Sequence, residues 1–165
     1  MECISVFDML KVGVGPSSSH TLGPWRAAER FLGELRATHK FENVNYIKVN
    51  LYGSLSLTGK GHATDLAIML GLSGQDPEYI PVQNIDKIIA AIKDKHILKL
   101  GDEIEIPFFP EEDIIFNKNF LPFHANGLIF TAFYENDSYE SIFYSIGGGF
   151  VVKEETTSVK SEIKC

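Results

Sequence analysis

The stretch Val44-Asn-Tyr-Ile-Lys-Val-Asn-Leu-Tyr52 alternates apolar and polar residues. Ile47, Val49 and Leu51 would face a protein core, and the residues between them would face the other way. A period of two residues is typical of a half-buried strand. We therefore predict a strand over residues 44–52, and the elements on either side of it decide the fold class.

Helical patterns lie on both sides of this strand. The stretch before it predicts a helix that follows a serine-rich loop, with Ser19 or Thr21 as its cap. After the strand, residues 53–61 are small and polar and predict a loop or tight turn. Residues 63–72 predict a second helix, and a third is predicted with Asn84 as its cap. The apolar stripes of the first and third helices are Leu22, Trp25, Ala28, Phe31, Leu32 and Leu35, and Ile85, Ile88, Ile89 and Ile92.

The pattern becomes that of strands after Lys95. Turn signals at Asn126-Gly127 and Glu135-Asn-Asp137 separate some of these strands. Helices with one early strand, followed by a run of strands, predict an α+β fold with a mixed or antiparallel sheet and helices packed on one face. We expect one domain over residues 1–155 and a polar tail over residues 156–165. The predicted strands cover residues 97–106, 113–117, 128–134, 141–146 and 150–153.

Composition excludes several classes of function. The 165 residues carry a formal net charge of −7, which disfavours nucleic acid or an anionic membrane as a partner. No apolar stretch is long enough to span a bilayer, and the first ten residues do not resemble a signal peptide. Cys3 and Cys165 lie near opposite ends and have no metal-ligand spacing. We expect a cytoplasmic protein without disulfides and without a metal site of its own.

The serine loop, Gly13-Val-Gly-Pro-Ser-Ser-Ser-His20, is the first candidate site. It leads into a helix whose first amide groups lack internal partners, and such amides favour an anion such as a carboxylate. Ser17, Ser18 and Ser19 add three hydroxyls, and His20 adds a group that titrates near neutral pH. The alternative is a capped turn with a surface histidine, and the residues alone leave both interpretations open.

Three further segments carry polar or glycine residues. His62 lies between glycines and the start of a predicted helix, where a neutral imidazole could act as a general base, or only bond locally. His124 and Asn126 belong to His124-Ala-Asn-Gly127, which is also consistent with a simple hairpin turn. The glycines of Tyr144-Ser-Ile-Gly-Gly-Gly149 form a turn or let a ligand approach the backbone.

These segments together resemble a known family. Residues 7–24, which contain the serine loop, closely resemble the opening of bacterial iron–sulfur L-serine dehydratases. The segments Gly53-Ser-Leu-Ser-Leu-Thr-Gly-Lys-Gly-His-Ala-Thr-Asp65, His124-Ala-Asn-Gly127 and Tyr144-Ser-Ile-Gly-Gly-Gly149 are similar to the same family and come in the same order. The resemblance extends to about Thr157.

The resemblance implies the family's beta domain, whose fold is similar to the substrate-regulatory domain of some phosphoglycerate dehydrogenases. It implies a lyase of amino-acid metabolism and gluconeogenesis that converts L-serine to pyruvate and ammonia, of the single-chain type. A separate alpha domain, absent from this chain, would hold a 4Fe-4S cluster through three cysteines, and Cys165 would not be a ligand. Pyridoxal phosphate is not expected. The implied partners are L-serine, the alpha domain and a second copy in a homodimer.

The implied mechanism assigns a role to each site residue. The cluster's open iron would bind the serine hydroxyl as a Lewis acid. His62 would remove the Cα proton, and His20 would orient the substrate or shuttle a proton. Ser17, Ser18 and Ser19 would hold the carboxylate, and His124 and Asn126 would join them in binding substrate. The chain alone would then be inactive. The competing hypotheses are an allosteric serine-binding module without a base, and a dimerisation module.

Overall fold

A mixed five-stranded sheet forms the base of the domain, in a computed structural model that describes residues 19–38, 40–59 and 63–154. The strand order is β4-β1-β5-β6-β7. β1 pairs in parallel with β4, and every other neighbouring pair in this sheet is antiparallel. The strands are β1 (Tyr46–Leu51), β4 (Ile114–Phe116), β5 (Gly127–Phe133), β6 (Ser138–Gly147) and β7 (Phe150–Lys153).

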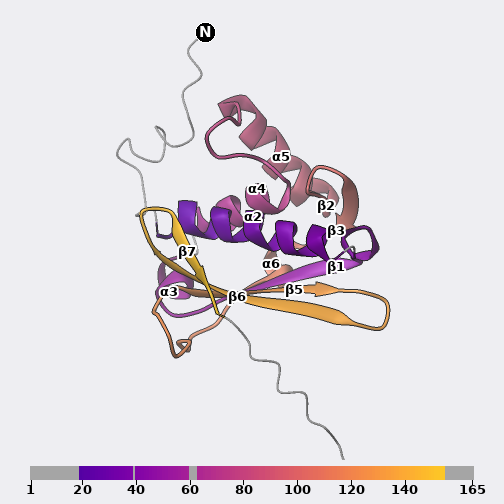
Figure 1. Cartoon of the computed structure of the whole chain (residues 1–165). Helices are drawn as coiled ribbons and strands as arrows, with labels where there is room; N and C mark the ends of the chain where they lie inside the picture. The colour runs from indigo at the N-terminus through magenta and orange to yellow at the C-terminus, as the bar shows by residue number, and fades with distance from the viewer. Residues whose placement is uncertain (1–18, 39, 60–62, 155–165) are drawn as a thin grey trace, which may run out of the picture.

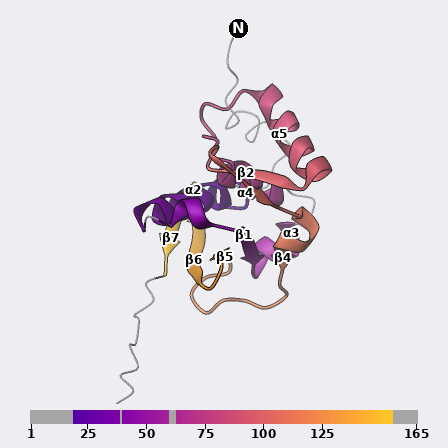
Figure 2. The same cartoon turned by 90° about the vertical axis from the view of Figure 1, so that its right-hand side faces the viewer.

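Helices cover one face of this sheet, which confirms the predicted α+β class (Figure 1). α2 contacts β5, β6 and β7, and α4 packs against α2. α5 and the hairpin of β2 and β3 pack on α4 and form the layer farthest from the sheet (Figure 2). These elements are α2 (Leu22–Ala37), α4 (Thr64–Leu72), α5 (Val82–Lys95), β2 (Ile97–Leu100) and β3 (Ile104–Pro107).

The core lies between α2 and the inner face of the sheet. Ile47, Val49 and Leu51 are fully buried, as the alternation in the sequence predicts. The Phe31 ring of α2 is fully buried and stacks on Phe130 of β5, with 5.2 Å between ring centroids. Burying one such side chain contributes about 1.5–3 kcal/mol, so these contacts fix α2 against the strands.

Two segments differ from the sequence prediction in their structure. A short helix, α3 (Ser54–Gly59), replaces the loop expected at residues 53–61. Its Leu55 is fully buried, and burial of this side chain outweighs the loop-like composition. The strand expected over residues 97–106 is instead the β2–β3 hairpin, because Gly101 and Asp102 both adopt positive φ and turn the chain.

Helix starts also differ from the prediction. α5 begins at Val82, with Pro81 before it, so Asn84 lies inside the helix rather than at its cap. Thr21 occupies the N-cap position of α2, but its side chain makes no capping hydrogen bond. η1 (Phe41–Asn43) and α6 (Pro110–Asp113) are short elements that the sequence did not predict.

Strand ends were predicted to within a few residues. β7 has the predicted bounds, whereas β6 begins at Ser138 rather than at residue 141. Asn126-Gly127 is not a hairpin turn, since Gly127 opens β5 and the β5–β6 turn lies between Phe133 and Ser138.

No helix in the described part of the chain is long and apolar enough to cross a membrane. The likeness to phosphoglycerate dehydrogenases stays a prediction, and the predicted tail lies outside the described residues.

Candidate functional site

The sheet topology brings three of the four candidate segments to one end of the domain. β1 and β6 both run antiparallel to β5, so the ends of β1 and β6 lie beside the beginning of β5. Gly53 follows β1, Asn126 precedes β5, and Ser145 lies near the end of β6. The beginning of α2, which follows the serine loop, lies at this same end (Figure 1).

Ser145 joins β6 to the serine loop. Its Oγ donates a hydrogen bond of 2.7 Å to the main-chain oxygen of Ser19, and the Ser145 side chain is fully buried. Gly23 of α2 makes this approach possible, because a Cβ atom on Gly23 would lie 1.8 Å from Ser145 Oγ. The glycine in the first turn of α2 therefore serves close packing against β6.

Thr64 joins α4 to the residue after Ser19. Its Oγ1 donates a hydrogen bond of 2.6 Å to the main-chain oxygen of His20, and Thr64 is fully buried. Ser19 Oγ and His20 Nδ1 lie 2.9 Å apart, within hydrogen-bonding distance. The beginnings of α2 and α4 are therefore in direct contact, although 44 residues separate His20 from Thr64.

Asn126 and His124 connect to the same network through Ser145. Asn126 and Ser145 exchange two hydrogen bonds, from Asn126 Nδ2 to Ser145 O (3.1 Å) and from Ser145 N to Asn126 O (3.0 Å). The main-chain N–H of Asn126 donates to His124 Nδ1 at 3.0 Å. Asn126 Oδ1 is buried and has no hydrogen-bond partner among the described residues. An acceptor in this state is suited to a donor supplied by a ligand or by another part of the protein.

The beginning of α3 is held against the segment that carries His124 and Asn126. Gly53 has a φ of +58°, and a Cβ atom there would lie 2.3 Å from the Ala125 oxygen. The N–H of Ser54 donates to that oxygen at 2.9 Å. A residue with a side chain at position 53 would push these two segments apart.

The structure brings together four of the seven predicted site residues. Ser19 and His20 are linked directly to α4 and β6, while His124 and Asn126 are linked to them through Ser145. The other three predicted residues, Ser17, Ser18 and His62, lie outside the described residues. His62 precedes Thr64 by two positions in the sequence.

Sequence reasoning did not single out Thr64 and Ser145. Both belong to candidate segments, but a threonine at the beginning of a helix and a serine in a strand have no distinctive chemistry. Ser145 shares the inner face of β6 with Phe143, where a polar residue is uncommon, and this is the signal that could have found it.

Next to Ser145, burial raises the pKa of the Tyr144 hydroxyl, and the Glu154 carboxylate adds to the rise, so this phenol stays protonated at neutral pH.

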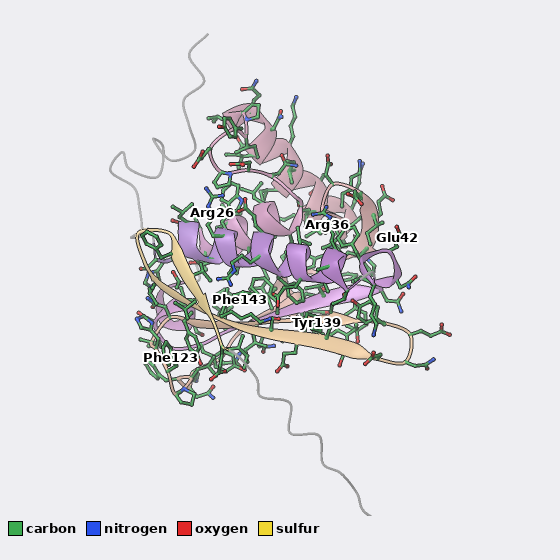
Figure 3. The ribbon with its side chains drawn as sticks, viewed as in Figure 1. Arg26, Arg36, Glu42, Phe123, Tyr139 and Phe143 are labelled. Atoms are coloured by element: carbon green, nitrogen blue, oxygen red, sulfur yellow. The ribbon has the colours of Figure 1, made fainter. Side chains whose placement is uncertain are left out.

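Large apolar side chains are exposed around this end of the domain. They come from α3, from the segment before β5, and from β6 and β7. Phe123 contacts the Tyr144 ring and projects at the end of the molecule opposite Glu42 (Figure 3). We call these residues the apolar rim: Leu57 (66% exposed), Phe120 (57%), Phe123 (65%), Ile146 (48%) and Phe150 (70%).

Comparison with known proteins identifies the family of this chain. A family model described as serine dehydratase beta chain matches residues 5–156. The chain belongs to the serine dehydratase beta chain family. The matched range contains all four candidate segments, including the serine loop and His62.

Curated relatives with the name L-serine dehydratase match most of the chain. The protein from Haemophilus influenzae is 46% identical over 155 residues, which cover 92% of this chain and 34% of the relative. L-serine dehydratase 1 of Escherichia coli is 43% identical, and the Streptomyces coelicolor protein is 42% identical, each over 92% of this chain and 34% of the relative. The chain thus spans about a third of the length of these relatives.

Proposed function

We propose that this chain is the substrate-binding domain of an L-serine dehydratase and that it supplies the histidine that acts as the base. The reaction converts L-serine to pyruvate and ammonia. The observation that carries the proposal is the contact between Thr64 and His20, which joins the beginnings of α2 and α4. It supports a shared crevice for the serine loop and His62, which come just before these two helices. Family membership and the relatives' names support the same reaction.

The residues at this end suit the two tasks that serine imposes. The substrate carboxylate needs donors, and the hydroxyls of Ser17, Ser18 and Ser19 precede a helix whose N-terminal amides and dipole favour an anion. The Cα proton needs a base, which we assign to His62. A positioned general base contributes about 10²–10⁴-fold to the rate. His20 would orient the substrate or pass on the proton.

The described residues do not fit an iron–sulfur cluster. They contain no group of three or more His, Cys, Asp or Glu side chains that could hold a metal ion. Cys3 and Cys165 are the two cysteines of the sequence, and both lie outside the described residues. We propose that the 4Fe-4S cluster of the family is held by a separate alpha domain, in the part of the relatives that this chain does not cover.

The apolar rim gives that alpha domain a place to bind. Rim residues lie beside the end of the sheet at which Asn126 and Ser145 meet, because Phe120 adjoins Gly53, Phe123 contacts the Tyr144 ring and Ile146 directly follows Ser145. About two thirds of each relative's length has no counterpart in this chain, which is ample for a covering domain. A domain seated on the rim would exclude water from the site and bring the cluster to the substrate.

Kinetics of variants in the full-length enzyme that carries this chain would test the proposal. His62→Ala should lower mainly kcat, because it removes the base. Ser17→Ala and Ser18→Ala should raise KM, because they remove binding that the ground state and the transition state share. Cluster content is checked for each variant. If His62→Ala keeps near-normal kcat with an intact cluster, the domain is a serine-sensing or dimerisation module and the base lies elsewhere.

A further inference from the structure

We infer that Thr64 and Ser145 are positioning residues that hold the end of the serine loop in its reactive geometry. The inference rests on the proposed function. Neither residue would touch the substrate. Each would act through the main chain of Ser19 or His20, by a hydrogen bond from a buried hydroxyl to a carbonyl oxygen.

The two hydrogen bonds fix two consecutive peptide groups. Ser145 Oγ holds the Ser19 oxygen from β6, and Thr64 Oγ1 holds the His20 oxygen from α4. Two anchors on adjacent carbonyls, drawn from different elements, leave the intervening backbone little freedom to rotate. The His20 side chain, which also lies within hydrogen-bonding distance of Ser19 Oγ, is thereby placed relative to α4.

Burial makes these hydroxyls hard to replace. Thr64 and Ser145 are both fully buried, so water cannot take over a lost hydroxyl without opening the packing. A partly buried carbonyl that loses a hydrogen bond from a buried hydroxyl is costly, and the chain would move to recover it. The movement would displace Ser19 and His20, the last two residues of the serine loop.

The beginning of α4 is unusual in its backbone as well. Ala63, which lies between His62 and Thr64, adopts φ +64° and ψ +11°, a left-handed conformation that residues with a side chain seldom adopt. Such a conformation persists where surrounding contacts enforce it. The Thr64 hydrogen bond holds the residue that directly follows Ala63, at the beginning of α4.

The two anchors predict different kinetic effects. The Thr64 hydroxyl holds His20 against the beginning of α4, which follows the proposed base, His62, in the sequence. Removing this hydroxyl should therefore lower mainly kcat. Ser145 holds the end of the serine loop, which is proposed to bind the substrate carboxylate. Removing the Ser145 hydroxyl should therefore mainly raise KM. Misplacement of reacting groups by about 1 Å costs up to about 10²-fold in rate.

The chain offers a matched control for each variant. Ser73 lies at the other end of α4, is buried, and donates a hydrogen bond of 2.7 Å from its Oγ to the Met69 oxygen. Ser141 lies on β6, is buried, and its Oγ bonds Glu34 Oε1 at 3.1 Å. Ser73→Ala and Ser141→Ala thus remove a buried hydroxyl from the same two elements, away from the candidate site.

The experiment measures kcat, KM and melting temperature for L-serine deamination by the full-length enzyme that carries this chain. Thr64→Val should lower kcat by about tenfold to 10²-fold, and Thr64→Ser, which keeps the hydroxyl, should restore most of it. Ser145→Ala should raise KM by about tenfold. In the two control variants, kcat and KM should stay within about twofold of the values for the unsubstituted enzyme. Their melting temperatures should fall by about as much as those of Thr64→Val and Ser145→Ala.

The results separate failure of the inference from failure of the proposed function. If His62→Ala loses kcat while Thr64→Val matches Ser73→Ala, the positioning role is wrong and the proposed function stands. If Thr64→Ser is as impaired as Thr64→Val, the hydroxyl is not what matters and the inference is also overturned. If His62→Ala keeps its kcat, the proposed function fails and the inference fails with it. Should Thr64→Val not fold, Ser145→Ala must still exceed Ser141→Ala in KM.

Discussion

Replacing Gly23 by alanine should destabilise the domain, whereas the same replacement at Gly33 of the same helix should stabilise it. A Cβ atom on Gly23 would lie 1.8 Å from Ser145 Oγ and 2.7 Å from Ser145 Cβ, so the contact between α2 and β6 must open. Overpacking of this kind costs about 1–3 kcal/mol. Displacing Ser145 Oγ from the Ser19 oxygen deprives the buried Ser145 hydroxyl of its acceptor, which costs about 1–3 kcal/mol more.

Gly33 is the matched control because, apart from its chain neighbours and the nearby backbone of α2 itself, no atom lies within 4 Å of a Cβ atom built there. Alanine in a helix interior is more stable than glycine by about 0.5–1 kcal/mol. Urea unfolding followed by the fluorescence of Trp25, the chain's one tryptophan, measures both variants, and Trp25 is buried in α2 close to Gly23. Equal unfolding midpoints for Gly23→Ala and Gly33→Ala would refute the close packing of α2 against Ser145.

Three further outcomes follow from the structure. Phe31→Ala, which empties the stack on Phe130, should lower the free energy of unfolding by about 3–5 kcal/mol in the same urea assay, and a loss below about 1 kcal/mol would contradict this packing. The hydrogen bond from Lys153 to the Glu34 carboxylate raises the Lys153 pKa, so its stabilisation is complete below the unfolded pKa of about 10.4 and is lost as pH rises further. Lys153→Met should therefore be less stable than the unsubstituted chain at pH 8, and the difference should shrink above about pH 10.4; a difference independent of pH would rule this out. Anaerobic iron–sulfur reconstitution of this chain alone should yield no stoichiometric cluster by optical spectroscopy, since its two cysteines lie near opposite ends of the sequence.

Local periodicity predicted the elements that bury one regular face. The alternation through Ile47, Val49 and Leu51 predicted β1, and the helical stripe through Trp25 and Phe31 predicted α2, since both patterns reflect burial against a single core. α3 could not be found in this way. Its sequence is typical of a loop, and the burial of Leu55 and the bond from Ser54 N to the Ala125 oxygen depend on distant parts of the chain.

The candidate site shows the same division. Glycine- and serine-rich segments and the histidines beside them were recognisable in the sequence because their chemistry is unusual. Thr64 and Ser145 were not, because their hydrogen-bond acceptors lie 44 and 126 residues away and only the fold brings them together. The hairpin of β2 and β3 was missed although Gly101-Asp102 is a turn signal within the predicted strand.

A crystal structure of the full-length enzyme with L-serine bound would test the central claim most directly. The claim is that the serine loop, His20 and His62 act on one substrate molecule at the end of the sheet where Ser19 and Ser145 meet. The account predicts the serine carboxylate on the hydroxyls of Ser17–Ser19 and the His62 imidazole within reach of Cα. His20 and His62 on opposite faces of the domain, or a bound serine that contacts neither, would contradict it.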